Sequence, residues 1–397
     1  MRIGLCGGTF DPLHNGHVAL IRAALTSGYV DRILVMPSGK PPHKSMALVS
    51  MARYRYEMAV RAFAGDDRIK VSDLEIVHPG PSYTLNTIQQ LRAMMPPDDE
   101  LYLIYGSDVL KDIGHWHEPA AILAACPLLL ADRGGYPDQM SRSLAEKLTT
   151  TYGARIRFFP APSIKLSGTR IRAAAAAGEP LTEWVPETVE RLIRKHGIYS
   201  WQSDLETLDP VYRSYLQDLE QQLWPLLTGK RLLHSLNVMN YALHLARLHH
   251  APLEDTGTAA LLHDCAKCLP VNEQLGLARR TGDEALLDPA LAHGPAGAWM
   301  ARNQFGIDNP VILNAIHYHT TGCARMSLVD KIIFIADKVE PARTYEHLAQ
   351  IRRLAEYDLD RSLLICMQEI GSFLDRENLP RHPYTQDALN DLNKAKT

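Results

Sequence analysis

The chain has 397 residues, more than a single hydrophobic core normally organises, so we expect two domains. Hydrophobic residues make up 46%, enough for globular cores, and the formal net charge of -3 argues against a large basic surface for nucleic acid. The six cysteines are scattered without a disulfide framework, no signal-peptide pattern is present, and the longest apolar run, 120–131, is too short to span a bilayer. We therefore expect a cytoplasmic protein without nucleic-acid or membrane partners; homo-oligomers remain possible.

The first motif spans Gly7 to His17. It follows an apolar stretch, 2–6, that predicts a buried strand, and it leads into an apolar helical pattern that ends near Leu25. Glycines let the backbone approach a phosphate, and the free N–H groups of a helix start attract anions. His14 and His17 are three residues apart and would share a face of that helix. The pattern favours a phosphate-binding turn over an ordinary strand–helix turn with two surface histidines.

Strands and helices alternate through the rest of this half of the chain. Further strands are expected at 32–36, 69–72, 101–105, 128–130 and 155–159, with helices at 53–63, 84–91 and 136–152 between them. This alternation predicts an α/β fold, a doubly wound parallel sheet of the Rossmann-like kind. A basic proline loop, 40–44, follows the second strand, and Ser82 or Thr84 is expected to cap the next helix. Asp108 follows the strand 101–105, where ligands of such sheets bind, and Trp116 offers either an aromatic face or a core residue.

A second helix start lies at 166–172. Ser167 is a candidate N-cap, and five alanines continue the helix to Ala177. Ser167, Thr169 and Arg172 therefore meet at one helix N-terminus, which favours a second anion site over a plain capped helix.

The first motif resembles the signature of the HxGH nucleotidyltransferases, and its Gly-Gly-Thr-Phe-Asp-Pro part is most similar to the nicotinate-mononucleotide adenylyltransferases. The resemblance covers 1–199. It implies transfer of an adenylyl group from ATP, accompanied by Mg²⁺, to nicotinate mononucleotide, which gives deamido-NAD and pyrophosphate in NAD biosynthesis. Phosphopantetheine remains an alternative acceptor. The family's arginine before Ser-Tyr-Thr is replaced here by His78.

The same resemblance assigns site residues by their place in the motifs. The catalytic residues are His14, His17, Lys44 and Arg172. The ATP-binding residues are Gly7, Gly8, Thr9, Phe10, Ser167 and Thr169. The acceptor-binding residues are Ser82, Tyr83, Thr84, Asp108 and Trp116.

After Tyr199 the pattern changes to helical periodicities without a convincing strand. The segment 200–210 is polar and ends in Asp-Pro, so we expect a nucleotidyltransferase domain at 1–200, a linker at 201–210 and an all-helical domain at 211–397. Cys265 and Cys268 form a CxxC inside a helical pattern, and we interpret both as packing residues.

The helical half contains an ordered set of histidines and aspartates. Asp264 and Asp337 each end an apolar helical run, where a carboxylate is costly unless it is paired or bound to a metal. Imidazole and carboxylate ligands suit Fe, Mn, Co or Zn better than Mg alone. Each histidine by itself would fit an ordinary core position; the set His234, His263, His293 and His319 favours one or two transition-metal ions.

This half resembles the HD-domain phosphohydrolases through the motifs at 261–267, 293–298, 319–327 and 335–343, over 213–360. The more similar members cleave diadenosine tetraphosphate symmetrically into two ADP. The resemblance implies a bifunctional enzyme, with iron as the metal and Mn, Co or Zn as alternatives. Another nucleotide phosphate as substrate, or a regulatory nucleotide-sensing module, remains an alternative. The implied metal ligands are His234, His263, Asp264 and Asp337. Positions that would face the polyphosphate or a second metal are Arg231, Lys267, His293 and His319.

Overall fold

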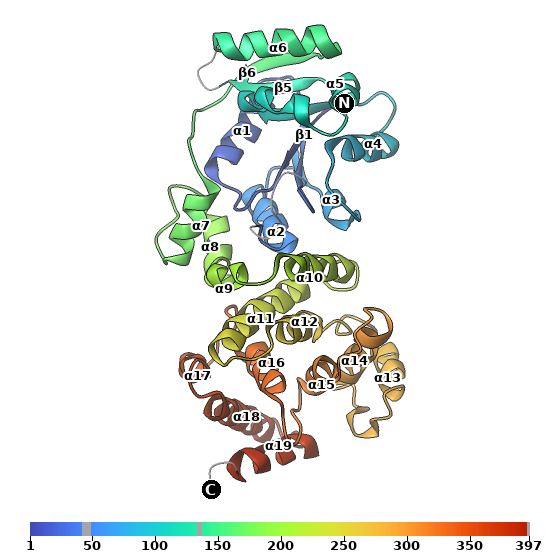
Figure 1. Cartoon of the computed structure of the whole chain (residues 1–397), viewed down its shortest axis with the longest axis vertical. Coiled ribbons are helices and arrows are strands. Elements are labelled where there is room, and N and C mark those ends of the chain that lie inside the picture. The colour runs from blue at the N-terminus through green and yellow to red at the C-terminus, as the bar shows by residue number, and fades with distance from the viewer. Residues whose placement is uncertain (42–48, 133–136, 395–397) are drawn as a thin grey trace. The chain divides into compact units, whose positions relative to one another are not determined.

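In a computed structural model the chain forms two compact units, one of 1–194 with 198–200 and one of 195–197 with 201–397 (Figure 1). The structure describes residues 1–41, 49–132 and 137–394. Within these ranges, no helix combines the length and apolarity that crossing a membrane would require.

The first unit is built on a six-stranded parallel sheet with the order β3-β2-β1-β4-β5-β6, which confirms the predicted α/β fold. The strands are β1 (Arg2–Gly8), β2 (Arg32–Pro37), β3 (Ile69–Val71), β4 (Glu100–Gly106), β5 (Leu128–Asp132) and β6 (Ile156–Pro160). From β1 the chain adds β2 and β3 on one side of the sheet and then β4, β5 and β6 on the other, so the order reverses between β1 and β4. These two strands pair from Arg2 with Glu100 to Leu5 with Leu103. Ligands of open α/β sheets bind at such a switch point, outside the carboxyl ends of the strands.

Helices cover this sheet. They are α1 (Asn15–Thr26), α2 (Ala52–Ala62), α3 (Leu74–Val77), α4 (Thr84–Met94), α5 (Pro119–Ala125), α6 (Gln139–Tyr152), α7 (Gly168–Ala176) and α8 (Glu187–His196), with 3₁₀ turns η2 (Ser107–Lys111) and η3 (Ile113–His115). Leu101 and Leu103 of β4 pack with residues of α4, α5 and α6 in one core cluster. Alternate strand residues point to opposite faces, and helix α1 contacts β2, β4, β5 and β6.

The cap expected for α4 was wrong, whereas the N-cap position expected in α7 is confirmed. Helix α4 has Tyr83 as its N-cap and no side-chain cap bond, because the Ser82 hydroxyl instead accepts the backbone N–H groups of Gly39 and Lys40 at 3.0 and 3.2 Å. Ser167 does occupy the N-cap of α7, but its side chain makes no cap hydrogen bond.

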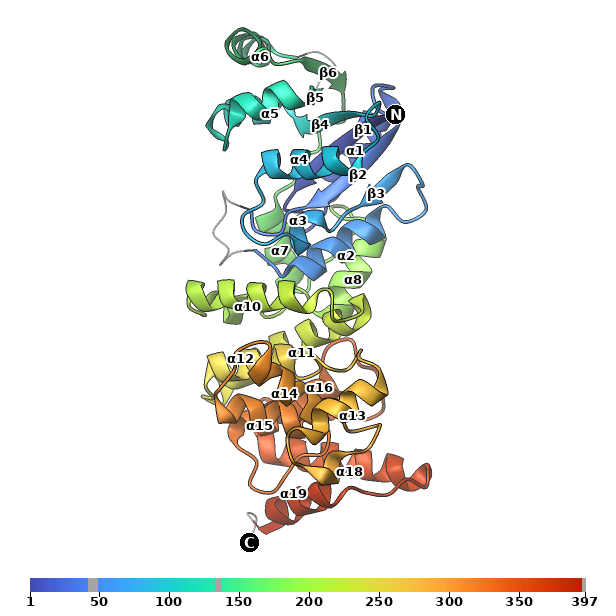
Figure 2. The same ribbon diagram turned by 90° about the vertical axis from the view of Figure 1, so that its right-hand side faces the viewer.

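The described residues of the second unit form helices joined by turns and loops, with no strand among them. Its helices are α9 (Gln202–Glu206), α10 (Pro210–Leu223), α11 (Gly229–Leu248), α12 (Leu253–Leu262), α13 (Val271–Arg279), α14 (His293–Asn303), α15 (Pro310–Tyr318), α16 (Leu328–Val339), α17 (Leu348–Ala355), α18 (Leu359–Arg376) and α19 (Pro383–Lys394), with the 3₁₀ turn η4 (Glu284–Leu286). Helix α11 is buried along most of its length and packs on α12 and α16, which in turn contact α15 (Figure 2).

Two segments of this region differ from their sequence interpretation. The short helix α9 lies inside the segment that we expected to be a linker. Cys265 and Cys268 follow α12 in a turn rather than a helix; Cys265 is buried, as a packing residue should be, but Cys268 is exposed, so its assignment was wrong.

Candidate functional site

The N-terminus of α1 holds His14 and His17 in a reciprocal capping arrangement. The backbone N–H of His17 donates to Nδ1 of His14 at 3.4 Å, and the backbone N–H of His14 donates to Nδ1 of His17 at 3.2 Å. The two rings stack with centroids 3.7 Å apart and planes 14° apart. A ring nitrogen that accepts a hydrogen bond carries no proton, so each neutral ring carries its proton on Nε2. Both rings thereby carry an Nε2–H donor at a helix N-terminus.

Burial lowers the pKa of His14 to about 4. The ring is therefore neutral near pH 7 in the free protein. His14 can act as a hydrogen-bond donor, and the helix N-terminus supplies electrostatic attraction for an anion.

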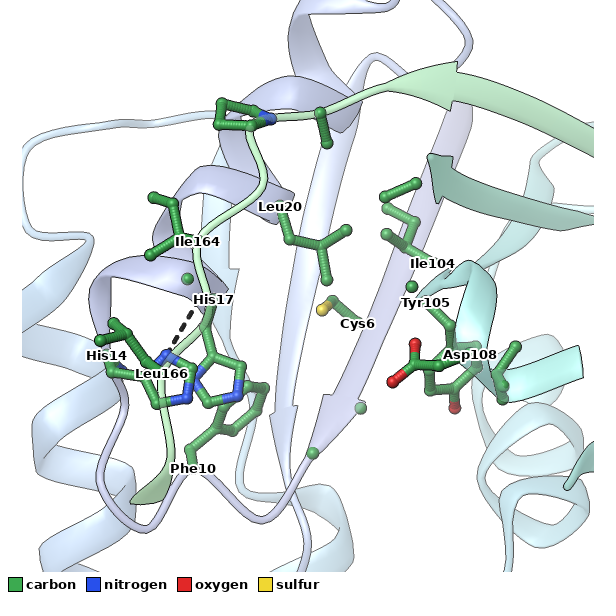
Figure 3. A pocket seen from close by; sticks show the side chains of 18 of the residues that line it. Cys6, Phe10, His14, His17, Leu20, Ile104, Tyr105, Asp108, Ile164 and Leu166 are labelled. Carbon is green, nitrogen blue, oxygen red and sulfur yellow. Dashed lines mark hydrogen bonds between the residues drawn. The ribbon is translucent and has the colours of Figure 1, made fainter. Parts of the chain in front are cut away.

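These histidines border a cavity of about 420 Å³ at the carboxyl ends of β1 and β4. Figure 3 shows the two rings at one side of the cavity, beside Phe10, with Asp108 at the other side. The edge of the Phe10 ring packs against His17 with centroids 5.0 Å apart. Asp112 also lines the cavity, so two carboxylates are present that could face a hydrated cation.

A second cavity, of about 240 Å³, lies on the other side of the glycine turn. It is lined by Ser82, Tyr83, Thr84, Thr9 and Trp116. The edge of Trp116 meets Tyr105 at 84° with centroids 5.4 Å apart. Gly7, Gly8 and Tyr105 line both cavities, so ligands in the two cavities would meet over the end of β1. Asp108, which we expected with the acceptor residues, lies in the histidine cavity instead.

The second cavity also contains a buried acid that sequence reasoning missed. Glu75 accepts a hydrogen bond from the Thr87 hydroxyl at 2.7 Å, and burial raises the pKa of its carboxyl above the usual range. A charged residue within the otherwise apolar α3 was the available signal.

The second predicted anion site meets the first motif through Arg172. Its Nη1 donates to the backbone carbonyl of Asp11 at 2.7 Å, while its buried Nε has no hydrogen-bond partner among the described residues. Ser167 and Thr169 do not line either cavity, although Leu166 lines the histidine cavity. Lys44 lies outside the described residues.

The second unit brings six predicted residues into one buried cluster. His234 comes from α11, His263 and Asp264 from the end of α12, His293 from the start of α14, His319 from the end of α15, and Asp337 from α16. Three overlapping groups each offer ligand atoms within 4.8 Å of one another: His234, His263 and Asp264; His263, His319 and Asp337; Asp264, His293 and His319.

Hydrogen bonds from Nδ1, the ring nitrogen that faces away from the cluster, orient two of these histidines. Nδ1–H of His263 donates to the carbonyl of Ala260, and Nδ1–H of His319 donates to the carbonyl of Ile316, both at 2.7 Å. Each ring therefore turns an unprotonated Nε2 toward the cluster. Nε2 of His263 is buried without a hydrogen-bond partner among the described residues, 3.4 Å from Oδ2 of Asp264. Such an orphaned nitrogen among histidines and carboxylates fits a transition metal.

Basic side chains contact two carboxylates of the cluster. Arg231 contacts Oδ2 of Asp264 at 2.6 Å, and Lys338 contacts Oδ2 of Asp337. Lys267 lies 3.2 Å from both ring nitrogens of His293.

A hydrogen-bond network behind His234 was not anticipated as part of the site. Glu340 lies 3.3 Å from His234 Nδ1 through Oε1, and its Oε2 accepts from Asn237 Nδ2 at 2.9 Å. The same Asn237 nitrogen lies 2.9 Å from Nδ1 of His196. The spacing of Asp337 and Glu340, close to one helical turn, was the only sequence signal for this network.

Each unit of the chain is similar to known proteins. The model of the Cytidylyltransferase-like family matches residues 5–174, and that of the HD domain matches residues 231–342. The chain is 38% identical over 200 residues to a probable nicotinate-nucleotide adenylyltransferase of Synechococcus sp., covering 50% of this chain and 94% of that protein. It is 38% identical over 199 residues to the corresponding probable enzyme of Thermus thermophilus, covering 50% and 100%.

A crystal structure from Clostridium acetobutylicum, described as a predicted HD superfamily hydrolase involved in NAD metabolism, has 35% identity and a TM-score of 0.44, covering 45% of this chain and 96% of that one. The sequence relatives and the two family models together settle the classification. The chain belongs to the nicotinate-nucleotide adenylyltransferase family and carries an HD domain after that half.

Proposed function

We propose that the first unit transfers the adenylyl group of ATP to nicotinate mononucleotide, giving deamido-NAD and pyrophosphate. The observation that carries this proposal is the pair of cavities that share Gly7, Gly8 and Tyr105. ATP in the histidine cavity and the acceptor in the Trp116 cavity would bring the α-phosphorus and the acceptor phosphate together over the glycine turn.

Catalysis would then rest on positioning and charge stabilisation, because no covalent intermediate is needed. Nε2–H of His14 and of His17 would donate to phosphate oxygens at the N-terminus of α1. Arg172 and Lys44 would add positive charge. Mg²⁺ bound to the triphosphate would neutralise its charge, and Asp108 and Asp112 are the carboxylates that line this cavity.

The Trp116 cavity supports a flat aromatic acceptor rather than phosphopantetheine. The rings of Tyr105 and Trp116 pack nearly perpendicular to each other, and Tyr83 lies against His117 with ring centroids 4.4 Å apart. Aromatic faces favour stacking on a pyridine ring, whereas a pantetheine chain offers no such face. Mass identification of the products from ATP with nicotinate mononucleotide, nicotinamide mononucleotide or phosphopantetheine tests the assignment.

We further propose that the HD unit hydrolyses diadenosine tetraphosphate to two ADP. Support comes from the buried cluster, in which His234, His263, Asp264 and Asp337 would hold a metal and His293 and His319 could hold a second. A bound transition metal lowers the pKa of a water ligand toward neutrality. Arg231 and Lys267 would neutralise phosphate charge, which suits a polyphosphate better than a monoester. Recovery of ATP and AMP in place of ADP would refute the symmetric cut.

A nucleotide-sensing role is the second candidate for the HD unit. A sensor needs a nucleotide pocket but not a complete set of buried ligand atoms, so the cluster favours hydrolysis. Elemental analysis of the full chain, with Asp264→Ala as the comparison, measures whether these residues bind metal.

A further inference from the structure

A cavity of about 430 Å³ in the second unit reaches the buried His/Asp cluster from the side of Asp337. It lies among the end of α16, the connection to α17, and α18. Asp337 is the one cluster residue that lines it; Arg231 and Lys267, in contrast, contact Asp264 and His293. The cavity is therefore a separate approach to the same centre.

Two aromatic rings at this cavity are unusually exposed for their type. Phe373 on α18 is 51% exposed and Tyr345 is 43% exposed, and both line the cavity. The Tyr345 hydroxyl donates to the backbone carbonyl of Lys338 at 3.1 Å, which holds its ring close to the end of α16. Both rings therefore present apolar area to a ligand in the cavity.

Cations connect these rings with the cluster. Nη2 of Arg343 lies 3.6 Å from Oδ1 of Asp337, and Lys338 contacts the other oxygen of that carboxylate. Arg376 also lines the cavity. An anion that reached Asp337 through the cavity would therefore pass guanidinium and ammonium groups before it met the cluster.

We propose that this cavity binds one nucleoside end of a nucleoside polyphosphate whose phosphates extend to the metal cluster. The inference rests on the proposed hydrolase function of the HD unit. Phe373 and Tyr345 stack on the base, and Arg343 and Arg376 contact the adjoining phosphates. Glu346 and Glu369, which also line the cavity, can accept hydrogen bonds from ribose hydroxyls.

The cations around Asp264 and those around Asp337 then have one common explanation. A phosphate chain that crosses the cluster meets Arg231 and Lys267 on one side and Lys338 and Arg343 on the other. A dinucleoside polyphosphate fits this arrangement, because each end of its phosphate chain carries a nucleoside. A mononucleotide would use only half of these groups.

The first test compares the full-length wild-type protein, loaded with Mn²⁺, with Phe373→Ala. Two constants are measured: KM for diadenosine tetraphosphate, and the inhibition constant of inorganic tetrapolyphosphate, which has four phosphates and no nucleoside. Loss of one stacking contact should raise KM about tenfold while the inhibition constant changes less than twofold. Tyr357→Ala is the matched control, because Tyr357 is an exposed aromatic (66%) that does not line the cavity. Equal changes in both constants, or no change in KM, would overturn the proposal.

The second test does not depend on hydrolysis. The wild-type chain is irradiated with 8-azido-substituted diadenosine tetraphosphate, and labelled peptides are identified by mass. We expect label within 338–376, and its loss in Phe373→Ala. If the wild type cleaves no diadenosine tetraphosphate but this label forms, the hydrolase proposal fails and the nucleoside site stands. Absence of label from 338–376 rejects the nucleoside site, whatever the hydrolysis assay gives.

Discussion

Replacing Glu340 with glutamine should weaken metal binding although Glu340 is not itself a proposed ligand. Oε2 of Glu340 accepts two N–H donors, from Asn237 at 2.9 Å and from the backbone of Ala342 at 2.7 Å. The amide oxygen of a glutamine must take this place, so its NH₂ group faces Nδ1 of His234, now 3.3 Å from Oε1. Nδ1 then has to accept, and the proton of the neutral ring moves to Nε2, the nitrogen that faces the cluster. His234 becomes a poor ligand because its tautomer is wrong.

The size of the effect follows from comparable sites. Loss of a group that orients a metal-bound histidine typically costs 10–100-fold in metal affinity, or about 1.4–2.7 kcal/mol. Glu340 is only 3% exposed, so solvent cannot easily replace the lost carboxylate. We therefore expect the effect near the upper part of this range.

Chelator-competition titrations of the metal-free protein with Mn²⁺ measure the affinity directly. Glu377→Gln provides the matched control, since it makes the same change at an exposed position of the same unit. Thermal unfolding of the metal-free variant, followed by circular dichroism, reports whether the HD unit remains folded. An unchanged affinity in Glu340→Gln, with both controls normal, would refute the tautomer argument.

Three further outcomes are expected. His17→Ala should lower the turnover of adenylyl transfer more than it raises the KM of nicotinate mononucleotide, because charge grows on the phosphates during transfer, and steady-state kinetics would show an unchanged turnover if this role were wrong. The pKa of His14 is about 4 in the folded chain and about 6.5 in the unfolded chain, so the unfolded chain takes up the proton first as the pH falls. Lowering the pH from 7 to 5 should therefore reduce the free energy of unfolding of the first unit by about 2 kcal/mol. Denaturant unfolding at the two pH values would measure this loss, which His14→Gln should not show. Gly39→Ala should destabilise the first unit by about 2 kcal/mol or more and raise the acceptor's KM, since its Cβ would lie 2.1 Å from the backbone oxygen of Glu75; Gly114→Ala, which meets nothing within 4 Å, is the control in the same melting and kinetic assays.

Strand positions and the folds of both halves could be predicted because they depend on local patterns. The apolar runs that became β1, β2, β4 and β5 were each flanked by glycine, proline or polar residues. The grouping of the His/Asp set could be expected because most of its members lie in short motifs that resemble those of the HD-domain phosphohydrolases. His317 is not among the residues grouped at this cluster; it pairs with Asp283 at 3.0 Å.

The rest depends on contacts between distant segments. Ser82 caps no helix because the backbone of Gly39 and Lys40 competes for its hydroxyl, and nothing local encodes that approach. The low pKa of His14 arises from burial, which only the folded chain provides. Glu340 lies 106 residues from His234 in sequence, and its place one helical turn after Asp337 does not say which ring it supports.

The central claim is that one chain carries two independent nucleotide chemistries. Its most direct test identifies by mass the products that the Mn²⁺-loaded wild type and Asp264→Ala form, first from ATP with nicotinate mononucleotide and then from diadenosine tetraphosphate. We expect the wild type to give deamido-NAD and pyrophosphate in the first reaction and only ADP in the second, and Asp264→Ala to retain the first reaction and lose the second. Loss of both reactions in Asp264→Ala, or hydrolysis that persists without Asp264, would contradict the account.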